Sequence, residues 1–122
     1  MVLVDHDNFT NIDSFETRVI RDAKSLRKFY SQINQTRKPG LPVPMVDFSQ
    51  HILVLVCLGE QQGETVPLIS KLKETEVELT MAVELSKKSS KGDMSNQMVY
   101  FPFYLYKLPL VDKTITFQRV DQ

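Results

Sequence analysis

The sequence has no tryptophan, one cysteine and only four glycines in 122 residues, and these shortages narrow the possible classes of protein. Because Cys57 has no second cysteine to pair with, no internal disulfide can form. Lys and Arg number 15, as do Asp and Glu, so no overall positive charge favours nucleic acid or an anionic membrane. No apolar run approaches the roughly 20 residues that span a bilayer. We therefore expect no nucleic-acid partner and no integral membrane segment; the oligomeric state is left open.

The length fits a single domain, which can bury a core without disulfides. Residues 1–14 are polar after a short apolar start, and we expect an N-terminal arm or a loose first strand ahead of a domain at 15–122. No leader peptide is visible at the N-terminus. Met1 is equally compatible with a sequence that begins after a removed leader. A lone cysteine suits a reducing compartment and a bacterial secreted protein equally.

One helix is predicted between residues 22 and 34. Its apolar residues recur every three or four positions, which is typical of a helix with one buried face, and they are Ala23, Leu26, Phe29, Tyr30 and Ile33. Asp22 is the expected N-cap, since its carboxylate can accept the free N–H groups of the first turn. A proline-rich loop follows at 36–47, and we expect its apolar residues to anchor it to the core: Leu41, Val43, Met45 and Val46.

The remaining segments have the composition of strands. Residues 51–58, HILVLVCL, are apolar on both alternating faces, which favours a central strand. The glycines of 59–64 predict a hairpin loop that turns this strand back antiparallel into 65–73, where Pro67 favours an edge, a strand start or a bulge. Further strands are expected at 15–20, 75–85, 97–108 (interrupted by Pro102) and 113–120, with a charged loop at 86–96. The predicted fold class is α+β, with one main helix packed on a mostly antiparallel sheet.

No pattern indicates a catalytic, cofactor-binding or metal site. The glycine turn after residue 58 lacks the Lys-Ser or Lys-Thr of a phosphate-binding loop. Cys57 lies inside an apolar strand, where a buried inert thiol is favoured over a nucleophile. His51 has no matched acid or base in a known pattern. Asp5 and Glu16 have the first-to-twelfth spacing of a calcium loop, but Phe9 and Thr10 stand where an oxygen ligand and a glycine are required, so DHDN (5–8) is interpreted as part of a polar arm.

Two surface features are compatible with a protein partner. The stretch Tyr100–Tyr106, YFPFYLY, alternates so that Phe101, Phe103 and Leu105 share one face. Tyr100, Tyr104 and Tyr106 share the other, which is a second half-covered face or a surface for a partner. The densest basic cluster is Arg18, Arg21, Lys24, Arg27 and Lys28. A solvated helix face is the interpretation we favour there over a site for an acidic partner.

The order of four segments resembles a known family. They are TRVIRD (17–22), AKSLRKFYSQI (23–33), VDFSQHILVLVCLGE (46–60) and FPFYLYKLP (101–109). Together they are similar to the C-terminal domain of PrcB, a subunit of a bacterial protease complex, over residues 17–120. The matching positions are Asp47, Phe48, Ser49, Leu58, Gly59, Glu60, Pro102, Phe103, Lys107, Leu108 and Pro109. The turn departs from the family, since QQGETVPL has one glycine and no tyrosine where Gly-Gly-Tyr is usual.

This resemblance implies a bacterial, often exported, non-catalytic domain that acts as an accessory or stabilising subunit of a protease. The residues expected to contact that partner are Gly59, Glu60, Gly63, Tyr100, Tyr104 and Tyr106. Two alternatives remain. A small-ligand or peptide-binding domain would use the aromatic strand 100–106 and the 59–66 turn, and would show an apolar pocket there. An enzyme would bring His51 together with Asp47 or Glu60 in a cleft.

Overall fold

The computed structural model describes residues 1–87 and 98–120 and contains two compact units. The first unit comprises residues 1–60 and 101–111, and the second comprises residues 61–100 and 112–122. The α+β class is confirmed, because one α-helix accompanies a majority of strands in the described residues. The expectation of one sheet was wrong, since the strands form several. The charged loop expected at 86–96 lies outside the described residues after position 87.

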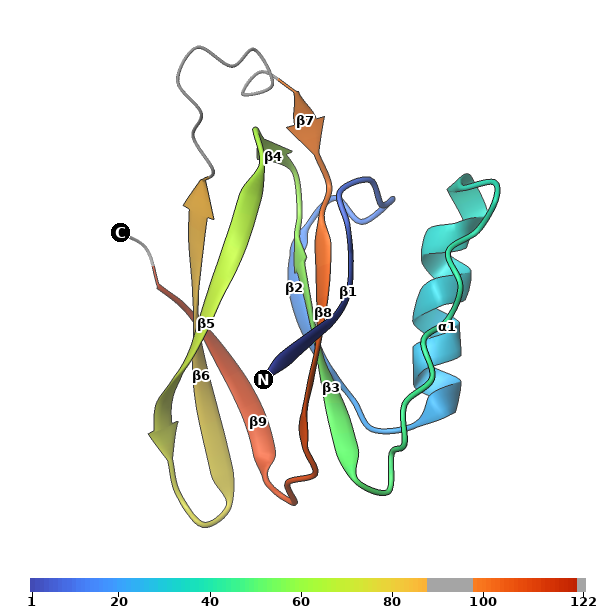
Figure 1. Cartoon of the computed structure of the whole chain (residues 1–122). Helices are drawn as coiled ribbons and strands as arrows, with labels where there is room; N and C mark the ends of the chain where they lie inside the picture. Colours follow the sequence, from blue (N-terminus) through green and yellow to red (C-terminus); the bar gives the residue numbers. More distant parts are fainter. Residues whose placement is uncertain (88–97, 121–122) are drawn as a thin grey trace. The chain divides into compact units, whose positions relative to one another are not determined.

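The first unit is built on a four-stranded sheet with the order β1-β8-β3-β2 (Figure 1). Its strands are β1 (Val2–Asp7), β8 (Phe103–Pro109), β3 (His51–Leu58) and β2 (Phe15–Ile20). All three pairings are antiparallel. β3 has a neighbour on each side and is buried from its second residue to its last, so the central strand is confirmed.

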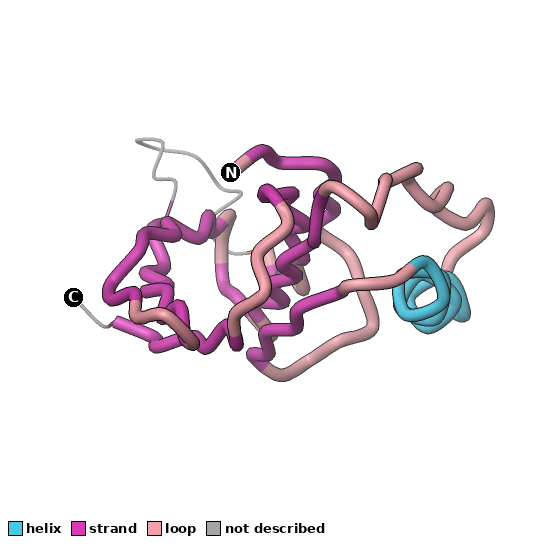
Figure 2. Tube along the Cα trace, turned by 90° about the horizontal axis from the view of Figure 1, so that it is seen from below, coloured by secondary structure: helices cyan, strands magenta, loops and turns pink. Residues whose placement is uncertain are grey.

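Helix α1 (Ala23–Ile33) packs on this sheet, and Figures 1 and 2 show it beside the strands of the first unit. Asp22 is the N-cap, as predicted, and its Oδ1 accepts the Ser25 N–H at 2.7 Å. The buried helix face meets alternate residues of β3 and β8 in one apolar core. The core comprises Ile12, Ile20, Leu26, Phe29, Tyr30, Ile33, Leu53, Leu55, Cys57, Phe103 and Leu105. The predicted apolar face is therefore right except for Ala23, which is exposed.

The N-terminal residues form an edge strand of this sheet, which is the second of the two alternatives that the sequence left open. β1 pairs with β8, with a bulge between Leu3 and Asp5. The phenol of Tyr30 on α1 donates a hydrogen bond to Asp5 Oδ2 at 2.5 Å. This bond ties the helix to the edge strand across 25 positions of sequence.

The segment between the helix and β3 runs back along α1 without regular secondary structure after η1 (Asn34–Thr36) (Figure 1). Its start is closed by the Asn34 side chain, which donates to the Leu41 carbonyl at 3.0 Å and accepts the Leu41 N–H at 2.8 Å. At its end Asp47 accepts hydrogen bonds from the N–H and hydroxyl of Ser49, which form a local turn before β3.

The second unit contains a three-stranded sheet with the order β5-β6-β9. β5 (Thr65–Glu74) and β6 (Glu78–Lys87) form an antiparallel hairpin, and β9 (Thr114–Val120) pairs with β6 in parallel. Pro67 lies near the start of the edge strand β5, as predicted. In β6, Met81 and Val83 are buried on one face and Ala82 is buried on the other.

The predicted hairpin across 59–64 was wrong. β3 does not pair with β5; the chain passes from the first unit into the second after residue 60. Two residues of this turn instead form β4 (Gln61–Gln62), which pairs with β7 (Val99–Tyr100). Pro102 interrupts the aromatic strand as predicted, and the two parts, β7 and β8, belong to different units.

Candidate functional site

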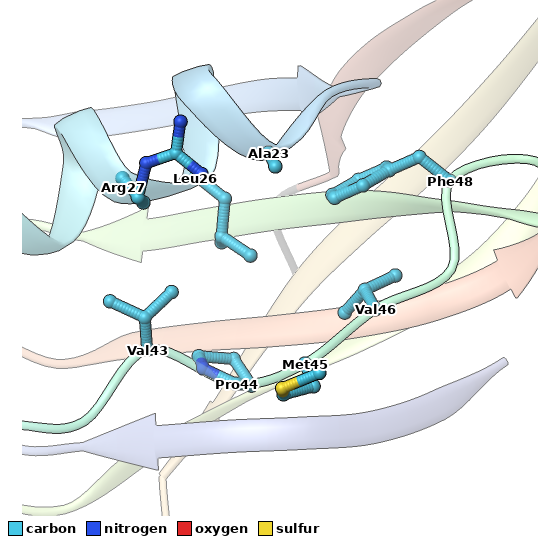
Figure 3. Close-up of a pocket in the computed structure, with 8 residues that line it drawn as sticks. All are labelled: Ala23, Leu26, Arg27, Val43, Pro44, Met45, Val46 and Phe48. Carbon is cyan, nitrogen blue, oxygen red and sulfur yellow. The ribbon is translucent and has the colours of Figure 1, made fainter.

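An open apolar groove of about 290 Å³ lies in the first unit, between α1 and the proline-rich segment that follows it (Figure 3). Its lining residues are Ala23, Leu26, Arg27, Val43, Pro44, Met45, Val46 and Phe48. We call it the α1 groove. Figure 3 shows the side chains of Leu26, Val46 and Phe48 pointing into the space between the helix and the segment. The floor is well packed, because Leu26 is part of the buried core and Val46 and Phe48 pack against that core.

The outer wall of the α1 groove consists of apolar side chains that reach solvent. Met45 is 98% exposed and Val43 is 40% exposed, so neither anchors the segment to the core, contrary to the prediction. Leu41 and Val46 provide that anchoring instead. The prolines on either side of Val43 restrict the backbone of the segment before any partner binds. Apolar side chains held in water by a pre-ordered backbone are typical of a binding surface.

The helix beside the α1 groove is basic. Arg27 lines it, and Lys24 and Lys28 lie on the same exposed side of a helix that contains no Asp or Glu. The nearest carboxylates in sequence are bonded locally. Ser25 holds the pKa of Asp22 below its usual range through two hydrogen bonds, and Ser49 does the same for Asp47.

A second cavity, of about 360 Å³, lies between α1 and β2 and is more polar. Its lining residues are Arg18, Val19, Ile20, Ser25, Lys28, Phe29 and Gln32. The Arg18 guanidinium is already paired with Glu16 at 2.8 Å and lies 6.0 Å from the centre of the Phe29 ring. The Arg18 charge is therefore paired within the fold, while the exposed Lys28 lines the same cavity.

The glycines predicted to contact a partner have structural explanations. Gly59 has a φ of +72°, and a Cβ there would lie 2.9 Å from the backbone of Ser14 and Phe15, so only glycine fits. Gly63, with a φ of +84°, donates its N–H to the Met98 carbonyl at 2.8 Å. Of the turn residues proposed as contacts, Glu60 alone is exposed.

The predicted tyrosine face is divided between the two units. Tyr100 is buried in β7 of the second unit, whereas Tyr104 and Tyr106 lie on β8 of the first. Tyr104 is 4% exposed and stacks on His6 with ring centres 4.1 Å apart. The His6 Nδ1–H donates to the Phe103 carbonyl at 2.9 Å, which fixes the ring against the strand. Neither of the two cavities described above includes any of these tyrosines.

The residues weighed for catalysis are not arranged as a reactive centre in the part of the chain described. Burial raises the pKa of Cys57 to about 12, which keeps the thiol protonated at neutral pH. His51 is close to Asp47, whose pKa it helps to lower, but Asp47 already accepts two bonds from Ser49 and neither residue lines a cavity described above. Glu60 lies beyond the opposite end of β3. Among residues 1–87 and 98–120 there is no group of three metal-ligating side chains.

Comparisons with protein-family models, curated proteins and solved structures find no match for this chain. Within the described ranges, no helix has the length and apolar character needed to cross a bilayer. The candidate site therefore rests on the geometry of the first unit. The sequence did contain one signal for it: Val43 and Met45 alternate with prolines, and a proline-rich extended segment has no ladder of hydrogen bonds to direct its side chains inward.

Proposed function

We propose that this chain is a non-catalytic protein-interaction domain whose contact surface is the α1 groove. The single observation that supports it most is Met45, which is 98% exposed beside a groove whose floor is the core of the unit. Methionine is common at such surfaces because its flexible, polarisable side chain adapts to a partner.

The open shape of the α1 groove favours a side chain of a protein partner over a free small molecule. Pockets for drug-sized ligands run from about 300 to 1,000 Å³ and enclose most of the ligand. At about 290 Å³ and open to solvent, this groove suits one or two apolar side chains of a peptide segment. Mostly pre-formed walls would limit the entropy that the partner's binding costs.

The biological setting we propose is an accessory or stabilising subunit associated with a bacterial protease. It is supported by the resemblance of residues 17–120 to the PrcB C-terminal domain. The glycines of the family-like turn are required by the backbone, so we place the contact on the α1 groove rather than on the 59–63 turn.

Site-specific photo-crosslinking tests this proposal. One variant carries p-benzoylphenylalanine in place of Met45, and the matched control carries it in place of Val77, which is 73% exposed in the β5–β6 turn of the second unit. Each purified variant is irradiated in lysate and culture medium of the source organism, and adducts are identified by mass spectrometry. We expect one dominant adduct, to a protease or its pro-form, from position 45 only.

One result would contradict the contact surface, and another would contradict the protease assignment alone. Identical adducts from positions 45 and 77 would mean that the surface near Met45 has no preference for a partner. A dominant adduct to a protein other than a protease would leave the interaction domain in place and remove the protease assignment. If the protease is captured, adding the purified chain to it at equal concentration should raise its thermal midpoint, and the Met45 variant without irradiation should raise it less.

A further inference from the structure

We propose that the segment bound in the α1 groove is an acidic peptide with a large apolar anchor residue. This inference rests on the proposed function and adds the chemistry of the partner. The anchor would enter between Leu26, Val46 and Phe48, and its flanking carboxylates would lie along Lys24, Arg27 and Lys28. An acidic segment with an apolar anchor complements this helix only if the cations are not already paired within the fold.

The cations of α1 are not neutralised by the fold. None of Lys24, Arg27 and Lys28 forms an ion pair with a carboxylate among the described residues. Lys24 does lower the pKa of Asp22, but as a minor contribution after the Ser25 hydrogen bonds. All three side chains are exposed. The other cations of this region differ: Arg18 pairs with Glu16, and Arg21 donates to the Val111 carbonyl.

The carboxylates of the first unit are, by contrast, mostly engaged away from the helix cations. Asp5 accepts from Tyr30, and Asp7 forms a two-point ion pair with Arg37 at 2.9 and 3.1 Å. These carboxylates therefore do not pair with Lys24, Arg27 and Lys28, whose charges remain on the exposed side of α1. A local positive field of this kind accelerates the encounter with an acidic partner and selects against a basic one.

The cations border two cavities. Arg27 lines the apolar α1 groove, and Lys28, one residue on, lines the polar cavity between α1 and β2. A peptide that lies along the exposed side of the helix would thus place an apolar residue on the Arg27 side while its carboxylates reach both Arg27 and Lys28. Lys24 extends this side by one turn, since residues four apart are neighbours on a helix.

Peptide selection with matched variants tests the inference. A phage-displayed library of random 12-residue peptides is selected on the full chain, and the enriched peptides are synthesised with a fluorescent label. Their affinities are measured by anisotropy for the wild type, for the double variant Arg27→Gln/Lys28→Gln and for the control Lys38→Gln/Lys73→Gln. The control removes the same charge from exposed positions off the helix. Met45→Gln and its control Val77→Thr probe the apolar wall in the same way.

We expect the enriched peptides to carry net negative charge and at least one large apolar residue. The Arg27→Gln/Lys28→Gln variant should bind them roughly 3- to 10-fold more weakly, while the Lys38→Gln/Lys73→Gln control stays within about twofold of the wild type. Met45→Gln should weaken binding about tenfold. Raising the salt from 50 to 500 mM NaCl should weaken binding to the wild type more than to the helix variant.

Other outcomes overturn the inference and separate it from the proposed function. Neutral or basic peptides that depend on Met45 but not on the helix cations would refute the acidic partner and leave the interaction domain standing. Failure to enrich any peptide would count against both. Binding of vesicles with 30% phosphatidylserine that is lost in the Arg27→Gln/Lys28→Gln variant, without binding of acidic peptides, would assign the cations to a membrane surface instead. Circular dichroism of each variant confirms that α1 is intact, since glutamine is a good helix former.

Discussion

Removal of one hydroxyl should show how strongly α1 is held to the sheet that carries the candidate site. Tyr30 is completely buried, and its phenol donates to Asp5 on the edge strand β1. Burial first, and the Asp5 carboxylate second, raise the pKa of Tyr30, so the phenol is protonated and able to donate at neutral pH. The substitution Tyr30→Phe keeps the ring contacts with Phe29 and Phe103 and removes only this donor.

The expected loss of stability follows from the charge on the acceptor. A hydrogen bond to an ionised group contributes about 1.5–3 kcal/mol, roughly twice that of a neutral pair. For a chain of this length, each kcal/mol corresponds to roughly 3–6 °C in the thermal midpoint. Tyr30→Phe should therefore lower the midpoint by about 5–18 °C.

Thermal and urea unfolding followed by far-ultraviolet circular dichroism measure this change. Tyr106→Phe is the matched control. It keeps the ring contact of this half-buried side chain with Tyr104, and the loss of its hydroxyl should cost less than about 0.5 kcal/mol. A double-mutant cycle of Tyr30→Phe with Asp5→Ala should give a coupling of at least about 1 kcal/mol. A coupling near zero would refute the reasoning, whatever the cost of each single variant.

Three further predictions concern single side chains. Burial raises the pKa of Cys57 to about 12, so iodoacetamide at pH 8 should modify it only at the rate of unfolding; rapid modification of the native chain would be inconsistent with its burial. Hydrogen bonds first from Lys113 and then from Lys71 lower the pKa of Glu74 from 4.5 to about 2, so its stabilising effect is complete above pH 4.5 and lost as the pH falls toward 2. When the urea concentration at half-unfolding is plotted against pH, Glu74→Gln should remove the part of the decrease below pH 4.5 that is due to Glu74. An unchanged plot would contradict this assignment. Asn34→Ala should cost about 1–3 kcal/mol in urea unfolding, because it breaks both bonds that close the proline-rich segment; a change within error would show that the segment is held by other contacts.

Local patterns in the sequence predicted the elements well. The spacing of Leu26, Phe29, Tyr30 and Ile33 determines which side of a helix is apolar, and Asp22 has the side chain that a helix start requires. Residues 51–58 are apolar on both faces, a property that only a covered central strand can use. Proline restricts its own backbone, so the sequence could predict that Pro67 lies in an edge strand and that Pro102 interrupts a strand.

The sequence could not predict which strands pair with each other, because pairing depends on residues distant in the sequence. Alternation in β6 shows which side is apolar but not that β9 would join it in parallel. The glycines at 59 and 63 were correctly identified as turn residues, yet a positive φ does not reveal which strand follows in space. The α1 groove was missed for a related reason: Val43 and Met45 are apolar, and hydrophobicity alone suggested that they would be buried.

The location of a bound peptide tests the central claim most directly. An acidic peptide from the selection, added to the ¹⁵N-labelled chain, should shift backbone amide resonances at 23–28 and 43–48, the two walls of the α1 groove. Shifts confined to residues 59–63 and 100–106, which include Gly59, Glu60, Gly63, Tyr100, Tyr104 and Tyr106, would support the site predicted from the sequence and contradict the α1 groove as the contact surface.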